Sequence, residues 1–152
     1  MQIFASYSCP YLSAAALDDK RVVKMCVETA QILSTVMHMY GRPDAPYKST
    51  HKNHPCVLWA AESQVNYAWL VRHFMALLDE YTGRYGRVHK CEQYTNVFLS
   101  VISHSASCLG VPAEFANCTP YKDMETHQAY QMYLNDRWES DIRAPKWYGV
   151  AA

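Results

Sequence analysis

The sequence predicts a single all-α domain, a helical bundle of about five helices that follows a short extended N-terminal segment. Its length of 152 residues suits one domain. Apolar residues recur every three or four positions along two long stretches, which is the helical spacing. Glycines and prolines mark where these stretches stop. No internal repeat or low-complexity tract is visible, so one unit covering 1–152 is expected.

The first half of the chain contains the clearest helical signal. Residues Gln2–Ser6 are predicted to be extended, and Pro10 to open a short helix that ends near Asp19. A long helix is expected from Lys20 to about Tyr40, stopped by a glycine and a proline, and a loop over 41–54. Its core stripe would be Val22, Val23, Cys26, Ala30, Leu33, Val36 and Met37.

A second long helix is expected to begin at Pro55 and to run to about Tyr85, with a break near Glu62 or Ser63. Further helices are predicted over 88–103 and from a cap at Asp123 to about Ser140, followed by an irregular tail. The core stripe of the long helix would be Ala61, Val65, Ala68, Val71, Met75 and Leu78.

The charges are balanced overall but unevenly spread. Lys+Arg and Asp+Glu number 14 each, whereas a duplex-DNA binder usually carries a basic excess. Basic residues gather over 42–54 and again at Arg84, Arg87, His89 and Lys90. The six cysteines form no C-x-x-C pair, and no leader or apolar run of about 20 residues is present. We therefore expect reduced thiols, no membrane contact and a cytoplasmic location, in the host cell if the protein is encoded by a phage.

Polar residues also recur at helical spacing on both long helices. Two interpretations stay open: each stripe is a solvated face, or the two stripes are facing walls of a cleft. The first stripe comprises Arg21, Lys24, Glu28, Gln31, Thr35 and His38, and the second Glu62, Asn66, Trp69, His73, Glu80 and Arg84.

The segment before Pro55 is the densest run of functional side chains. His51, Asn53 and His54 precede a helix N-terminus, whose free N–H groups attract anions, and Lys48 and Lys52 add positive charge. A phosphate site is one interpretation, and a polar capping loop is the other. Zinc is a competing hypothesis, but the spacing does not match that of zinc fingers, so no metal or other cofactor is expected. Its candidate ligands are His51, His54, Cys56, His89 and Cys91.

The tail combines aromatic and basic residues. Trp147 and Tyr148 lie beside Lys146, with Trp138 and Arg143 upstream. Such residues stack on unpaired bases in nucleic-acid-binding proteins. The alternative is that the rings hold the tail against the bundle.

Five segments carry a resemblance to a known family. Residues 1–4 (MQIF), 19–25 (DKRVVKM), 50–56 (THKNHPC) and 80–86 (EYTGRYG) resemble small phage proteins related to the pyrimidine-dimer DNA glycosylases. The ending 143–149 (RAPKWYG) is similar to the C-terminus of the phage endonuclease V type of enzyme. The resemblance therefore touches both ends and the middle of the chain.

The resemblance implies a helical enzyme that acts on damaged or modified duplex DNA. The N-terminal amine would attack the sugar carbon of the damaged nucleotide, the base would leave, and a Schiff base would form, which permits AP-lyase strand cleavage. Gln2 is bulky enough that we expect the initiator methionine to stay, so the nucleophile would be the amine of Met1. The assisting carboxylate would be Asp19 or Glu28.

The resulting candidate residues fall into two groups. The catalytic candidates are Met1, Asp19, Glu28, His51, His54 and Glu62. The nucleic-acid-binding candidates are Arg21, Lys24, Lys48, Lys52, Asn53, Arg84, His89, Lys90, Lys146, Trp147 and Tyr148.

Two other functions compete with this one. The first is a phage enzyme acting on a nucleotide or RNA, with an acid–base site drawn from His51, His54, His73, Glu62 and Glu80. The second is a non-enzymatic phage protein that binds a host partner through a tyrosine-rich surface, an interpretation that the neutral net charge favours.

Overall fold

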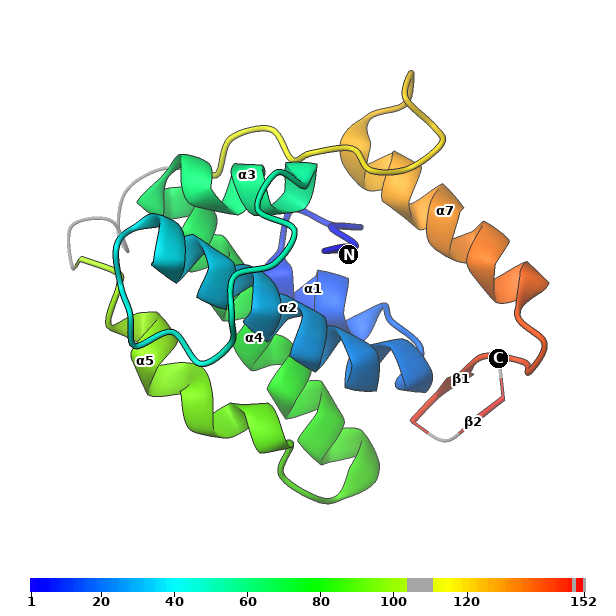
Figure 1. Ribbon diagram of the computed structural model, residues 1–152. Helices are drawn as coiled ribbons and strands as arrows, with labels where there is room; N and C mark the ends of the chain where they lie inside the picture. The colour runs from blue at the N-terminus through cyan, green and yellow to red at the C-terminus, as the bar shows by residue number, and fades with distance from the viewer. Residues whose placement is uncertain (104–110, 149, 152) are drawn as a thin grey trace.

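The computed structural model describes residues 1–103, 111–148 and 150–151. This part of the chain is all-α apart from one minimal hairpin, as the sequence predicts (Figure 1). The helices and strands, in order, are α1 (Pro10–Ala15), α2 (Asp19–Met39), α3 (Pro55–Glu62), α4 (Gln64–Tyr85), the 3₁₀-helix η1 (Lys90–Tyr94), α5 (Thr95–Leu99), α7 (Thr126–Ser140), β1 (Lys146–Trp147) and β2 (Val150–Ala151).

Helices α2 and α4 pack against each other at the centre, and α1 and α3 both contact α4. Helix α2 begins where the carboxylate of Asp18 accepts a hydrogen bond from the backbone N–H of Arg21. It ends before Gly41, whose φ of 79° is a conformation that glycine adopts without strain. The predicted core stripe of α2 is confirmed, except that Val23 is only half-buried.

The predicted break in the second long helix lies at Ser63. This residue is extended, with φ −154° and ψ 160°, and its Oγ accepts a hydrogen bond from the Asn66 N–H. Ser63 therefore ends α3 and caps α4. Helix α4 ends at Gly86, which has a φ of 68° and donates its N–H to the carbonyl of Thr82.

The second polar stripe does not line a cleft, contrary to one of the two interpretations, nor is it a solvated face. Asn66, Trp69 and His73 are buried, because residues 5–10 and 111–115 cover this side of α4. Trp69 Nε1 donates to the carbonyl of Ser8 at 2.8 Å, and His73 Nδ1 donates to that of Pro10 at 3.0 Å. Backbone carbonyls of a remote segment thus accept from Trp69 and His73, while the buried Nε2 of His73 has no hydrogen-bond partner among the described residues.

The predicted apolar stripe of this helix is correct only in part, because burial extends around α4. Ala68, Val71 and Leu78 are buried, but Met75 is 36% exposed, and Ala61 and Val65 are half-buried. The large side chains that fill the core are instead Tyr67, Leu70, Phe74, Leu77 and Tyr81.

Three predictions for the later part of the chain need correction. The helix expected over 88–103 is a 3₁₀-helix joined to the five-residue α5, and residues 104–110, which follow it, lie outside the described residues. Helix α7 is capped by Glu125 rather than Asp123, since the carboxylate of Glu125 accepts from the His127 and Gln128 N–H groups. The tail is not irregular: β1 and β2 pair as an antiparallel hairpin.

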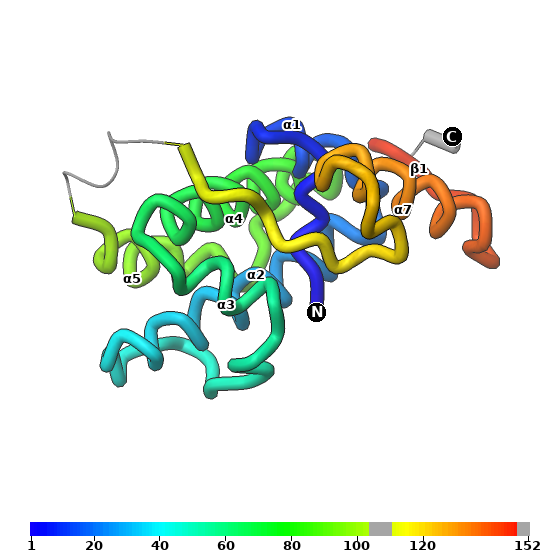
Figure 2. The backbone as a smooth tube through the Cα atoms, turned by 90° about the horizontal axis from the view of Figure 1, so that it is seen from above, coloured from blue at the N-terminus to red at the C-terminus, as the bar shows by residue number. Residues whose placement is uncertain are grey.

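The N-terminal segment is enclosed between the helical bundle and α7, an arrangement visible in both Figure 1 and Figure 2. Residues 3–6 are buried although they belong to no helix or strand. Helix α7 holds them through two side chains: His127 Nδ1 donates to the carbonyl of Ala5 at 2.6 Å, and Gln131 Nε2 to that of Ser6 at 2.7 Å. Phe4, with a φ of 56°, stacks on Tyr133. The chain start therefore has a fixed position.

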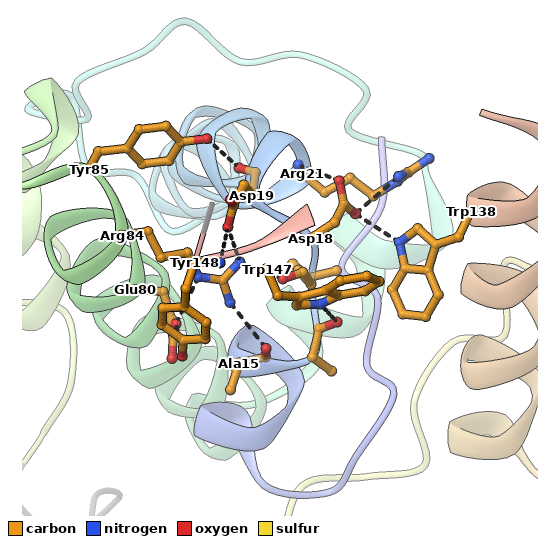
Figure 3. A network of polar contacts seen from close by, with 12 residues as sticks. Ala15, Asp18, Asp19, Arg21, Glu80, Arg84, Tyr85, Trp138, Trp147 and Tyr148 are labelled. Carbon is orange, nitrogen blue, oxygen red and sulfur yellow. Dashed lines mark hydrogen bonds and ion pairs between the residues drawn. The ribbon is translucent and has the colours of Figure 1, made fainter. Parts of the chain in front are cut away.

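A buried guanidinium joins the C-terminal hairpin to three helices (Figure 3). The side chain of Arg84 is 1% exposed and forms ion pairs with Asp19 at 3.1 Å and Glu80 at 3.0 Å. It also donates to the carbonyls of Ala15 and Leu17. The ring of Tyr148 lies 4.5 Å from the guanidinium carbon, which is a cation–π distance.

We expect Arg84→Met to destabilise the fold by about 2–3 kcal/mol, because the variant leaves two partly buried carboxylates without their cation. Urea unfolding followed by circular dichroism measures the change. Arg42→Met is the matched control: Arg42 pairs with Asp44 at an exposed site, so the unfolding midpoint should hardly move. Equal midpoints for the two variants would contradict the role given to Arg84.

Candidate active site

The N-terminal amine and a glutamate of α2 form the centre of the candidate site. The Met1 nitrogen lies 3.8 Å from Glu28 Oε1, and the Met1 side chain is 3% exposed while that of Glu28 is 20% exposed. Glu28 belongs to the first polar stripe, on the part of α2 that faces the chain start. The carboxylate is therefore held beside the amine and remains reachable by solvent.

Two histidines approach the same amine. His54 caps α3, because its Nδ1 accepts the Cys56 N–H at 3.1 Å. Burial lowers the pKa of His54, and the positive charges of the N-terminal amine and of His51 lower it further, while Glu28 opposes them. His51 has a φ of 51°, and its Nδ1 is 2.8 Å from the hydroxyl of Thr50. Met1, Glu28, His51 and His54 thus share one electrostatic environment.

Two thiols lie next to this group. Cys56 Sγ is 3.6 Å from Sγ of Cys118, a residue of the segment between 111 and α7. The hydrogen bond between the two sulfurs lowers the pKa of Cys118 to about 6, with help from Tyr130, Lys122 and the N-terminal amine. The same hydrogen bond and burial raise the pKa of Cys56. The contact between the sulfurs thus favours ionisation of Cys118 over that of Cys56.

A wide groove with basic walls runs along the start of α2. Its volume is about 1140 Å³, and it lies between α2 and residues 137–146. Its cationic side chains are Lys20, Lys24, Arg137, Arg143 and Lys146. Three acids also line the groove, and of these Asp18 and Asp141 pair with Arg21 and Asp19 pairs with Arg84. The exposed lysines are thus left to give the groove its positive charge.

A smaller polar hollow of about 520 Å³ lies on the other side of Glu28, one helical turn along α2. Gln31 and the loop residues Tyr47, Lys48, Thr50 and His51 line it. Its walls offer an amide, hydroxyls, an imidazole and an ammonium group. These groups can hydrogen-bond a phosphate or the edge of a base.

The structure thus brings together four of the catalytic candidates and separates two others. Met1 lies beside Glu28, His54 lies within the influence of both charges, and the His51 carbonyl accepts the backbone N–H of His54 at 2.8 Å. Asp19 lies nine residues before Glu28, roughly 13 Å along the helix axis, and is bound to Arg84 and to the Tyr148 N–H. Glu62 lies at the opposite end of α3 from His54.

The nucleic-acid-binding candidates divide in the same way. Lys24 and Lys146 line the basic groove, Lys48 lines the polar hollow, and Lys52 and Asn53 are exposed beside it. Four of the remaining candidates are engaged within the protein. Arg21 pairs with Asp18 and Asp141, Trp147 donates to the Ala16 carbonyl, and Arg84 and Tyr148 both contact Glu80. The last two lie at η1, which His89 caps and which begins at the exposed Lys90.

The acid–base set of the alternative enzyme does not converge. His73 is fully buried between α1 and α4, and Glu80 is occupied by Arg84 and by the hydroxyl of Tyr148. Glu62 lies at the end of α3 opposite His54, so it is apart from the two remaining histidines. The basic groove is lined by none of these five residues, and the polar hollow by His51 alone among them.

Sequence reasoning missed Cys118 and Gln2. Cys118 is 62 residues from Cys56, and no spacing rule connects them. The Gln2 side chain donates to the Cys118 carbonyl at 3.0 Å. The size of Gln2, which bears on removal of the initiator methionine, does not indicate this contact. Two of the five zinc candidates, His54 and Cys56, lie close to Cys118. Two others, His89 and Cys91, lie at η1.

A family model described as pyrimidine dimer DNA glycosylase matches residues 1–93, well over half of the chain. The chain belongs to this family. The matched part contains the amine, Glu28, both histidines and Cys56, whereas Cys118, α7 and the tail lie beyond it. The family description gives DNA as the substrate class and base excision as the chemistry.

No curated protein and no solved structure matches the chain. Within residues 1–103, 111–148 and 150–151, none of the helices combines the length and apolar character that crossing a bilayer requires.

We expect the stability of this glycosylase-family protein to fall as the pH drops from about 6.5 to about 4. Burial lowers the pKa of His73 to about 4 from a usual 6.5, so the unfolded chain takes up a proton that the folded protein refuses over this range. The free energy of unfolding would lose up to about 1.4 kcal/mol per pH unit from this group. Urea unfolding at several pH values measures the slope.

His73→Asn removes the titrating ring and keeps a donor for the Pro10 carbonyl. The pH dependence of this variant should be flatter between pH 4 and 6.5, even if its overall stability is lower. Parallel curves for the two proteins would show that other groups cause the acid sensitivity.

Proposed function

We propose that this protein is a DNA glycosylase with AP-lyase activity, in which the amine of Met1 is the nucleophile and Glu28 the assisting carboxylate. The observation that carries the proposal is the 3.8 Å approach of the Met1 nitrogen to Glu28 Oε1, inside the part of the chain that the family model matches. A buried methionine side chain keeps the amine in place, so the nucleophile is oriented before DNA binds.

The reaction follows from the chemistry of a primary amine. The neutral amine attacks C1′ of the damaged nucleotide, and the bond from C1′ to the base breaks, its electron pair leaving with the base, which is then protonated. Loss of an amine proton and opening of the sugar ring give a Schiff base between C1′ and the Met1 nitrogen. Removal of a C2′ proton then expels the 3′ phosphate, and water releases the product and restores the amine.

Glu28 can act at two of these steps. Its carboxylate can accept the proton that the amine loses on attack, and its negative charge stabilises the cationic Schiff base. The separation of 3.8 Å is an ion-pair distance. In free enzymes such contacts are often longer than in the substrate complex, where they tighten.

Charged and polar groups flank Glu28 on both sides, which suits a strand that passes over it. Lys20 and Lys24 precede Glu28 on α2 at four-residue intervals and therefore share its face. His51 and Lys48 border the polar hollow beyond it. The phosphates of the damaged strand would follow the lysines, and the extruded nucleotide would reach the amine at the centre.

Borohydride trapping tests the nucleophile. A duplex carrying one abasic site should form a covalent adduct with the protein upon reduction, and a duplex carrying a cyclobutane pyrimidine dimer should form one after base release. Peptide mapping should place the adduct on the Met1 nitrogen. Acetylating the Met1 amine, or adding two residues before it, should abolish trapping. An adduct on a lysine, or trapping that survives acetylation, would overturn the assignment.

Glu28→Gln should lower the turnover on the dimer-containing duplex by roughly 100-fold or more, since it removes the charge but keeps the size of the side chain. Single-turnover cleavage assays measure the rate, and circular dichroism checks the fold. Glu92→Gln changes an exposed carboxylate on η1 and is the matched control, with unchanged turnover expected. A Glu28→Gln rate within a factor of three of the wild type would argue against the role of this residue.

The double variant Lys20→Gln/Lys24→Gln should bind duplex DNA more weakly and with a smaller dependence on salt. Losing two phosphate contacts should reduce the slope of log affinity against log salt concentration by about two. Titrations by fluorescence anisotropy at three salt concentrations provide the slope. Arg42→Gln, beyond the other end of α2, should leave the slope unchanged because Arg42 is paired with Asp44. Equal slopes for all three proteins would place the DNA elsewhere.

A further inference from the structure

Three potential metal-binding side chains meet beside the chain start. His54, Cys56 and Cys118 each offer one ligand atom, and these atoms all lie within 4.8 Å of one another. Two of the residues belong to the N-terminus of α3, and the third comes from the segment before α7. Cys56 is buried, and the other two are half-buried. We propose that these three side chains bind a zinc ion, independently of the function proposed above.

The separation of the two sulfurs fits a tetrahedral ion. With zinc–sulfur bonds of about 2.3 Å, two thiolates on one zinc are roughly 3.8 Å apart, and the Sγ atoms here are 3.6 Å apart. A disulfide would require about 2.05 Å between the same atoms. The pair therefore already has the spacing of two ligands of one ion.

The donor set selects the kind of ion. Thiolates and an imidazole suit zinc, whereas magnesium and calcium prefer carboxylate and carbonyl oxygens. Three protein ligands leave one position of a tetrahedral ion for water or another small ligand. Gln2 is placed to support such a site, since its Nε2 holds the Cys118 carbonyl while its buried Oε1 has no hydrogen-bond partner among the described residues.

The fold holds the cluster from three directions. The Cys118 N–H donates to the hydroxyl oxygen of Tyr130 on α7 at 3.2 Å, and Gln2 holds the carbonyl of the same residue. His54 is held by the capping bond from the Cys56 N–H to its Nδ1. Binding an ion requires the ring to turn away from that bond, and losing one cap is a small cost beside the affinity of two thiolates for zinc. The ion would connect α3 to the segment that leads into α7.

Metal content and a cobalt spectrum test the proposal on the full-length protein without DNA. Protein purified under reducing conditions should contain one zinc per chain by atomic emission. Replacing zinc by Co²⁺ should produce a thiolate-to-cobalt charge-transfer band in the near ultraviolet. Cys56→Ser and Cys118→Ser should each weaken zinc binding by at least about 100-fold, the upper end of the loss when only a supporting group is removed.

Cys9→Ser and Cys91→Ser are the matched controls, because their thiols lie outside the cluster, and both variants should keep the band. Circular dichroism separates a lost ligand from a lost fold. The proposal is overturned if the wild-type protein shows neither zinc nor a cobalt band, if Cys118→Ser binds as tightly as the wild type, or if mass spectrometry finds Cys56 and Cys118 joined as a disulfide under the reducing conditions used. Since none of these measurements involves DNA, they stand apart from the trapping and turnover experiments.

Discussion

Burial of residues 3–6, directly after the N-terminal amine, is the constraint on which the candidate site depends. The ends of a chain usually fray unless they are tied down. Here Ile3, Phe4 and Ala5 are buried, and His127 and Gln131 of α7 bind the backbone carbonyls that would otherwise lack partners. An amine at the very start of the chain thereby acquires the fixed position that side chains on helices have by default.

The distribution of ion pairs explains how a protein without net charge presents a basic groove. Four of its acids are held by two arginines: Asp19 and Glu80 flank Arg84, and Asp18 and Asp141 flank Arg21. The lysines along α2 have no such role in the described part of the chain. Overall composition therefore does not describe the local charge that a phosphate would meet in the groove, where five cationic side chains face three carboxylates.

Local signals in the sequence predict most of the helices, and they fail where burial is decided by remote segments. The break at Ser63 and the ends at Gly41 and Gly86 follow from capping and glycine chemistry within a few residues. The burial of His73 does not, because the backbone that covers it comes from Pro10. Within the candidate site, Glu28 lies on a polar stripe that is visible in the sequence. The sequence does not show that Glu28, rather than Asp19, is the carboxylate beside the amine, because this depends on where the chain start lies in the fold.

The enclosure of the chain start has a consequence for where this protein can be divided. The family model ends at residue 93, but the wall that covers the first six residues is α7, which begins at Thr126. A fragment cut at that boundary would expose the ring of Phe4 and the carbonyls of Ala5 and Ser6 to water. In this chain, helix α7, which lies beyond the family match, thus completes the enclosure of the chain start that the matched part begins.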